Sequence, residues 1–178
     1  MTRKRSSNAE LLARARRLLN HGASLLQQGK AEEAIGRLEL AYDLDRESVP
    51  ILINLGGAYV LAGRHGEAVP LLEAASDVEP HNAMIWINLG AAYLGNPVLA
   101  TPERQMRAIQ AFEKALELDP AAPNVHYNLG LIFIDRQETD LATAAFRRAI
   151  QVNPLDRDAH YWLRKLDVAK DDSGEWDE

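Results

Sequence analysis

The chain has no cysteine among its 178 residues, and only 6% of them are aromatic. The missing thiols exclude disulfide bonds, thiolate metal sites and cysteine nucleophiles, and they fit a reducing compartment. Long apolar runs are missing too, since no segment reaches the 18 or so uninterrupted apolar residues of a membrane-spanning helix. The basic start is not followed by the apolar run of a secretory signal. We therefore expect a soluble, cytoplasmic protein that does not contact membranes.

Positive charge is in the minority, with 20 Lys and Arg against 26 Asp and Glu, and a net charge of -6. This balance argues against a general nucleic-acid binder. The charge is also uneven, because basic residues gather between Arg3 and Arg17 and acidic residues follow Lys170. We expect a basic N-terminal arm at 1–8, a folded domain at 9–170 and an acidic tail at 171–178.

Patterns that carry catalysis or bind metals are missing as well. The five histidines do not cluster at metal-ligand spacing, and paired acids such as Glu32 and Glu33 fall on predicted solvent faces. No phosphate loop is present, because Ser24 stands where the loop needs its first glycine. His126 and His160, one repeat apart, are expected to pack in the core. We expect no catalytic residue, no metal site and no cofactor, so the protein is not expected to be an enzyme.

The sequence repeats itself. Two columns of small residues define the period, Gly22, Gly56, Gly90 and Gly130 in one and Ala34, Ala68, Ala108 and Ala142 in the other. The glycines are separated by 34, 34 and 40 residues and the alanines by 34, 40 and 34. Six extra residues therefore lie between Tyr93 and Ala108, and without them the period is a strict 34 residues. A fixed period of this length indicates a stacked repeat architecture.

Each unit is predicted to hold two amphipathic helices, because its apolar residues recur at helical spacing. Glycine separates the two helices in the first units, and proline ends the second helix in the later ones. The predicted units span about 15–48, 49–82, 83–122 with an insertion at 95–101, and 123–156, followed by a capping helix at about 157–170.

The third unit resembles the tetratricopeptide repeat (TPR) family position by position, and the other units match nearly as well. The matching residues are Trp86, Leu89, Gly90, Tyr93, Ala108, Phe112, Ala115 and Pro120. The resemblance implies an all-α fold, a right-handed superhelical α-solenoid of four helix-turn-helix repeats plus a C-terminal capping helix. Each repeat in such a stack is stabilised mainly by its neighbours, so the end needs a cap. We expect Tyr161 and Leu163 of the capping helix to face the fourth unit.

The resemblance also implies that the first helices of successive units line a concave groove that binds a peptide. An asparagine recurs two residues before each column glycine, and an amide can pair with a ligand's peptide groups whatever its side chains are. The predicted groove residues are Asn20, Asn54, Asn88, Asn128, Ile53, Ile87, Tyr127 and Leu131. The alternative is that the asparagines satisfy local helix groups and that the apolar residues pack internally. Whether the ligand is extended or helical stays open.

These observations favour a non-catalytic scaffold or adaptor whose partner is a protein or peptide. One alternative is a self-association module, a homo-oligomer in which a terminal helix or the acidic tail occupies another copy's stack. Nucleic-acid contact through Arg3–Arg17 is less favoured. A co-chaperone-type groove for terminal carboxylates is disfavoured, because the positions that would carry its cations hold none. The insertion at 95–101 either contacts a ligand or is a surface excursion.

Overall fold

The computed structural model describes residues 2–173, and the side chains of residues 8–167 except Val98. Within residues 2–173 all regular elements are helical. They are α1 (Thr2–Gln27), α2 (Ala31–Leu44), α3 (Val49–Leu61), α4 (His65–Val78), α5 (Ala83–Leu94), the 3₁₀ helix η1 (Pro97–Leu99), α6 (Pro102–Leu118), α7 (Val125–Asp135), α8 (Thr139–Val152) and α9 (Arg157–Ser173). The predicted basic arm is thus continuous with α1, and the predicted acidic tail lies outside the described residues after Ser173.

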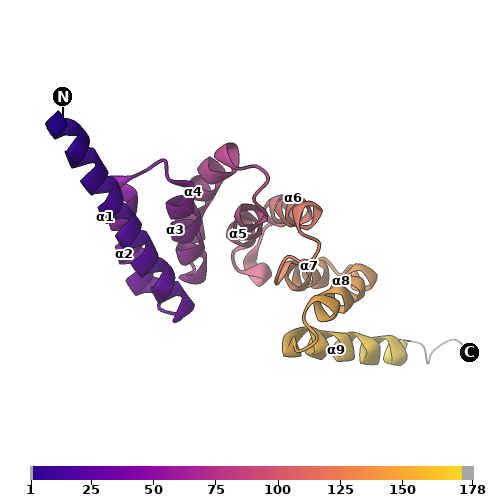
Figure 1. Ribbon diagram of the computed structural model, residues 1–178. Helices are drawn as coiled ribbons and strands as arrows, with labels where there is room; N and C mark the ends of the chain where they lie inside the picture. Colours follow the sequence, from indigo (N-terminus) through magenta and orange to yellow (C-terminus); the bar gives the residue numbers. More distant parts are fainter. Residues whose placement is uncertain (1, 174–178) are drawn as a thin grey trace, which may run out of the picture.

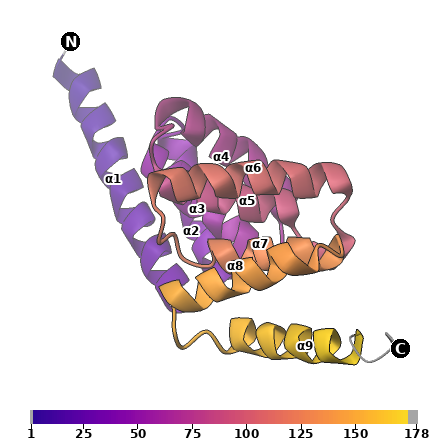
Figure 2. The ribbon, with the colours of Figure 1, turned by 90° about the vertical axis from the view of Figure 1, so that its right-hand side faces the viewer.

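The helices form four sequential antiparallel pairs, α1 with α2, α3 with α4, α5 with α6 and α7 with α8. The pairs stack in chain order, and α1 and α9 lie at opposite ends of the stack (Figure 1). Figure 2, which views the stack from the side of α9, shows α1 as the most distant helix. This arrangement confirms the predicted all-α stack of four helix pairs plus a capping helix.

The glycine columns mark the places where the two helices of a pair come closest. A Cβ added to Gly90 on α5 would lie 2.4 Å from the ring of Phe112 on α6, and one on Gly56 would lie 2.6 Å from Leu72. Atoms at such distances overlap, so no larger residue fits without moving the facing side chain. The column glycines therefore set the spacing between the two helices of each pair, as expected from a small residue that recurs once in every unit.

The insertion forms a short element between α5 and α6 of the third unit. Its residues Pro97–Leu99 make η1, which contacts α7, and Leu99 is 75% exposed. The Thr101 hydroxyl accepts a hydrogen bond from the Arg104 backbone N–H at 3.4 Å, and α6 begins at Pro102, as expected for this pair of residues. The insertion thus packs at a junction between units as well as presenting an exposed side chain.

The capping helix packs on the fourth unit through Ala159 and Leu166, which are buried, and through the Trp162 ring. Trp162 stacks on Phe146 of α8 with 6.0 Å between ring centroids. Leu163 joins this cluster, but Tyr161 is 52% exposed, so the prediction for Tyr161 is wrong. The physical reason is the helical period, which places residues three and four apart on one face and turns residue 161 away from it.

Candidate binding groove

The first helices of the pairs line the inner side of the stack. Among the described residues, α3 contacts both α1 and α5, whereas contacts between successive second helices are at most marginal. At the first two junctions, the units therefore lie closer together on the side of the first helices. We call the eight predicted groove residues on α1, α3, α5 and α7 the inner wall.

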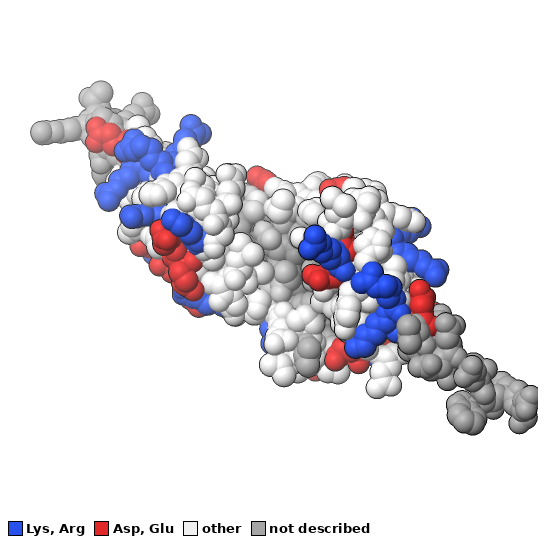
Figure 3. Space-filling view, turned by 90° about the horizontal axis from the view of Figure 1, so that it is seen from below, with Lys and Arg blue, Asp and Glu red and all other residues white. Residues whose placement is uncertain are grey.

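Three of the four helices of the inner wall, α3, α5 and α7, carry almost no charge. Helices α3 and α5 contain no Lys, Arg, Asp or Glu, and α7 contains only Asp135, at its last position. By contrast, α2, α4, α6 and α8 each contain at least three charged residues. On the face shown in Figure 3, charged side chains gather toward the two ends and leave the middle largely uncharged.

The apolar residues of the inner wall are half-buried. Ile53 packs against the core cluster of the first three units, and Ile87 packs against the cluster of the third and fourth units. Tyr127 and Leu131 pack against the cluster between α8 and α9. Each of the four keeps part of its surface exposed. Internal packing, the alternative raised by the sequence, therefore describes one side of each residue, and the other side is exposed to solvent.

The asparagine row differs from one unit to the next. Asn20 is exposed, and Asn54, Asn88 and Asn128 are half-buried. The Asn54 amide donates to the Pro50 carbonyl at 2.8 Å, which is the local role considered as the alternative. The other three amides form no hydrogen bond with any described residue, and the Asn88 side chain lies against Gly57 of α3. Their role in binding a ligand stays a prediction.

Tyr127 is held in place by aromatic neighbours. Its ring lies 5.8 Å from the Phe146 ring, centroid to centroid, with a tilt of 58°. Burial is the main cause that raises the pKa of the Tyr127 hydroxyl above 10, and a hydrogen bond with Trp162 opposes this shift. The hydroxyl is therefore protonated at neutral pH and can donate a hydrogen bond.

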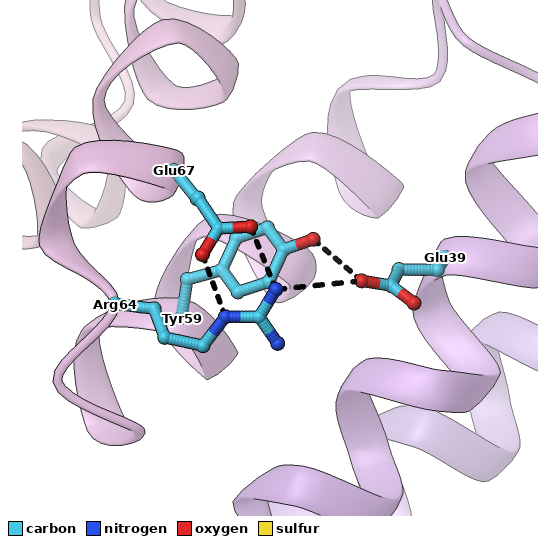
Figure 4. A network of polar contacts seen from close by, with 4 residues as sticks. All are labelled: Glu39, Tyr59, Arg64 and Glu67. Atoms are coloured by element: carbon cyan, nitrogen blue, oxygen red, sulfur yellow. Dashed lines mark hydrogen bonds and ion pairs between the residues drawn. The ribbon is translucent and has the colours of Figure 1, made fainter.

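A polar clamp joins the first two units, and sequence reasoning missed it. The Tyr59 hydroxyl on α3 donates to Glu39 on α2 at 2.7 Å, and the Arg64 guanidinium lies 4.5 Å from the centre of the Tyr59 ring (Figure 4). Arg64 also pairs with Glu67 through two hydrogen bonds of 2.7 and 2.6 Å. Burial, and then the bond to Glu39, raises the pKa of Tyr59 to about 12.

The same clamp recurs one unit later. The Tyr93 hydroxyl on α5 donates to Glu73 on α4 at 2.8 Å, and Arg107 lies over the Tyr93 ring at 4.0 Å while pairing with Glu73 at 2.8 Å. The sequence did hold a signal, because each glutamate precedes its tyrosine by 20 residues. The clamps tie two first helices of the wall, α3 and α5, to the unit before each of them.

A second repeated contact lies at the start of the first helices. Trp86 donates through its indole N–H to the Pro80 carbonyl at 2.8 Å, and a ring nitrogen of His160 lies 3.0 Å from the Pro154 carbonyl. His126 makes the corresponding hydrogen bond to Pro120. His160 is exposed and His126 half-buried, so the prediction that both pack in the core is wrong. The two histidines replace an indole that fastens the preceding turn.

In the described part of the chain, no three His, Asp or Glu side chains come together as metal ligands. None of its helices has the length and hydrophobicity that crossing a bilayer requires.

Comparisons with known proteins agree with this architecture. Family models described as tetratricopeptide repeat match residues 19–75, 58–100 and 123–154, and one described as TPR repeat matches residues 104–135. MamA of Desulfovibrio magneticus RS-1 is similar in structure, with a TM-score of 0.71 and 23% identity over 89% of this chain and 86% of that one. The thermophilic TPR protein TTC0263 of Thermus thermophilus has a TM-score of 0.72 and 19% identity, over 88% and 82% of the two chains. No curated protein sequence matches the chain.

Proposed function

Because the chain belongs to the tetratricopeptide repeat family, whose fold generally mediates protein–protein interactions, we propose that it is a non-catalytic adaptor. It binds a segment of a partner protein along the inner wall. One observation carries this proposal: α3 and α5 contain no Lys, Arg, Asp or Glu. On the same helices, the wall residues Ile53, Asn54, Ile87 and Asn88 stay partly exposed.

An uncharged, partly apolar stripe is unusual on the surface of a chain in which 26% of residues are charged. Contiguous apolar patches on soluble proteins mark sites of association, and charged residues are depleted in the core of interfaces. The second helices carry the charge that keeps the outer face hydrated. This division between the two faces supports a partner on the inner side of the stack.

The chemistry of the wall defines the partner segment. Ile53, Ile87 and Leu131 offer apolar contacts, so the segment contributes apolar side chains of its own. The amides of Asn20, Asn88 and Asn128 can both donate and accept, so they pair with peptide groups of the segment. Because no cation stands among the wall residues, recognition does not depend on a terminal carboxylate.

Replacing the asparagine row tests this function. In a variant with Asn54, Asn88 and Asn128 changed to Ala, we expect proteins captured from native lysate by the wild-type chain to be lost or strongly reduced, while the circular dichroism spectrum is unchanged. The matched control changes Gln110 and Gln151, exposed amides on α6 and α8, to Ala and should capture as the wild type does. Equal capture by the triple variant and the wild type would refute the role of the row.

A further inference from the structure

The N-terminal end of the stack has a charged edge that the rest of the inner side lacks. Helix α1 is 26 residues long against 14 in its partner α2, and its first turns extend beyond α2 (Figure 1). Along this helix the chain places six cations and a single carboxylate, Glu10. Figure 3 shows the Lys and Arg side chains of this end next to the grey N-terminal residues.

A hollow of about 640 Å³ lies between this part of α1 and the turn that joins α2 to α3. Clefts that bind ligands are commonly about 300–1,000 Å³, so the hollow is of suitable size. Its apolar lining includes Leu12, Leu19 and Ile51, and its polar lining includes Arg16, Arg17, Asn20 and Asp45. Leu12 is 44% exposed beside it. The hollow thus combines an apolar floor with two arginines and one carboxylate.

The arginines of this edge lack partners among the described side chains. Arg14, Arg16 and Arg17 are exposed and form no ion pair there, whereas Arg64 and Arg107 each pair with a glutamate. Unpaired cations beside a low-polarity surface give the edge a positive potential that attracts an acidic ligand. We call Leu12, Arg16, Arg17 and the hollow the basic edge.

We propose that the basic edge binds the acidic segment of residues 171–178 from a second copy of the chain. This segment is the most acidic stretch in the sequence and carries a single large apolar residue, Trp176. Its carboxylates are Asp171, Asp172, Glu175, Asp177 and Glu178. The carboxylates pair with Arg16 and Arg17, and the indole fills the apolar part of the hollow beside Leu12. An aromatic side chain next to arginine partners is a common anchor of interfaces.

The segment must come from another copy, because its own basic edge is out of reach. Helix α9, which ends at Ser173, lies at the opposite end of the stack from α1 (Figure 1). Four steps between packed helices separate the two ends, and each step is about 8–10 Å. The five residues that follow Ser173 span at most about 18 Å when fully extended. A contact within one molecule is therefore excluded.

Association of this kind joins different surfaces of the two copies, so each copy keeps a free segment or a free basic edge that can bind a further copy. Head-to-tail contacts form open chains whose length grows with protein concentration. Because the contact is electrostatic and exposed, it weakens as salt rises. The inference extends the proposed function, since Leu19 and Asn20 belong both to the hollow and to the groove side of α1, but the neutral wall on α3, α5 and α7 takes no part in it.

Sedimentation velocity of the full chain at low salt, from about 10 μM to 1 mM, tests the proposal. We expect the average sedimentation coefficient to rise with concentration in the wild type. In a variant with Arg16 and Arg17 changed to Glu, association should weaken at least tenfold. The control with Arg147 and Arg148, an exposed pair on α8, changed to Glu should associate as the wild type does.

A charge exchange makes the test specific for the segment. Changing Asp171, Asp172 and Glu175 to Lys should abolish association, and combining this change with the Arg16→Glu and Arg17→Glu changes should restore it. The proposal would be overturned if the wild type were monomeric at all concentrations, if association survived in the Arg16 and Arg17 variant, or if the charge exchange did not restore association. An oligonucleotide that binds through Arg16 and Arg17 in place of the segment would also overturn it. The variant with Asn54, Asn88 and Asn128 changed to Ala should associate normally, which separates this contact from the proposed groove.

Discussion

At the first two junctions between units a tyrosine hydroxyl binds a glutamate of the preceding unit, whereas at the third junction Phe133 takes the tyrosine position and offers no hydroxyl. An arginine covers each tyrosine ring, but none of the described cations covers Phe133. The two clamped junctions thus share a polar link that the third one lacks.

The third junction has a different set of contacts. The buried amide of Gln105 on α6 donates to Asp135 on α7 at 2.6 Å, and η1 contacts α7 where α5 and α7 make at most marginal contact. The glycine column runs through all units, and each of its glycines faces a large apolar side chain of the paired helix, as Gly130 faces Phe146. Apolar packing between paired helices is therefore common to all units, whereas the polar contacts between units differ from one junction to the next.

The largest effect is expected at the contact common to all units. Changing Gly90 to Ala places a methyl group 2.4 Å from the Phe112 ring, so we expect the free energy of unfolding to fall by about 1–3 kcal/mol. A urea denaturation curve measures it. The control is Gly36→Ala, where nothing lies within 4 Å of the new Cβ, and stability should rise by about 0.5–1 kcal/mol. Equal effects at the two glycines would contradict the close approach.

A smaller effect should separate the clamped junctions from the third. Glu73→Gln removes the carboxylate that accepts from Tyr93 and pairs with Arg107, and we expect a loss of about 1 kcal/mol, limited because the pair is half exposed. The equivalent Glu113→Gln, on exposed α6 surface one unit later, should change stability by less than about 0.5 kcal/mol. Thermal melts of the two variants check this. If Glu113→Gln destabilises as much, the third junction has the same link.

The turns within the units allow a reciprocal exchange. Gly63 has a φ of +74° between α3 and α4, and Gln137 has a φ of +62° at the matching turn of the fourth unit. Because this region disfavours residues with a Cβ, Gln137→Gly should raise the free energy of unfolding by about 0.5 kcal/mol, and Gly63→Gln should lower it by about 1 kcal/mol. Chemical denaturation measures both. A loss of stability in Gln137→Gly would show that its side chain matters more than its backbone angle.

The smallest expected effect is on the pH dependence of stability, through His126 in the fourth unit. Burial, and secondarily the charge of Arg148, lowers the pKa of His126 below 6.5, although the bond to Pro120 opposes this. As pH falls, the unfolded chain therefore takes up a proton at His126 before the folded chain does. The stability that depends on neutral His126 is present above about pH 6.5 and is lost as pH falls below that value. His126→Trp keeps an N–H donor, as Trp86 has, and should make the fall in urea midpoint between about pH 7 and pH 5 shallower. His65, whose pKa is also lowered, leaves part of the slope in place. An unchanged slope would show that His126 does not contribute.

The sequence predicted the helix pairs, because the glycine and alanine columns repeat at one period and a column position depends only on packing between neighbouring helices. It also predicted the start of α6, since Thr101 and Pro102 act through local backbone geometry. The clamps could not be read in the same way. Tyr59 and Glu39 meet across two helices, and their pairing depends on side-chain directions that a period does not fix.

For the candidate groove, the sequence located the asparagine row but not the state of each amide. Asn54 donates to the Pro50 carbonyl because that carbonyl lies four residues earlier, one turn before residue 54 on the same helix. Trp162, not Tyr161, anchors α9, since a shift of one residue turns a side chain by about 100° around a helix. Such differences follow from angular detail within an element whose existence was predicted correctly.

The thin contact between α6 and α7 has a consequence for how the stack opens. In a one-dimensional array, cooperativity passes only through the interfaces between neighbours, so the weakest interface is where unfolding divides the array. Amide protons of α7, α8 and α9 should therefore exchange with solvent as one block, sooner than those of α3 to α5, and the C-terminal third of the protein should open while the rest stays folded.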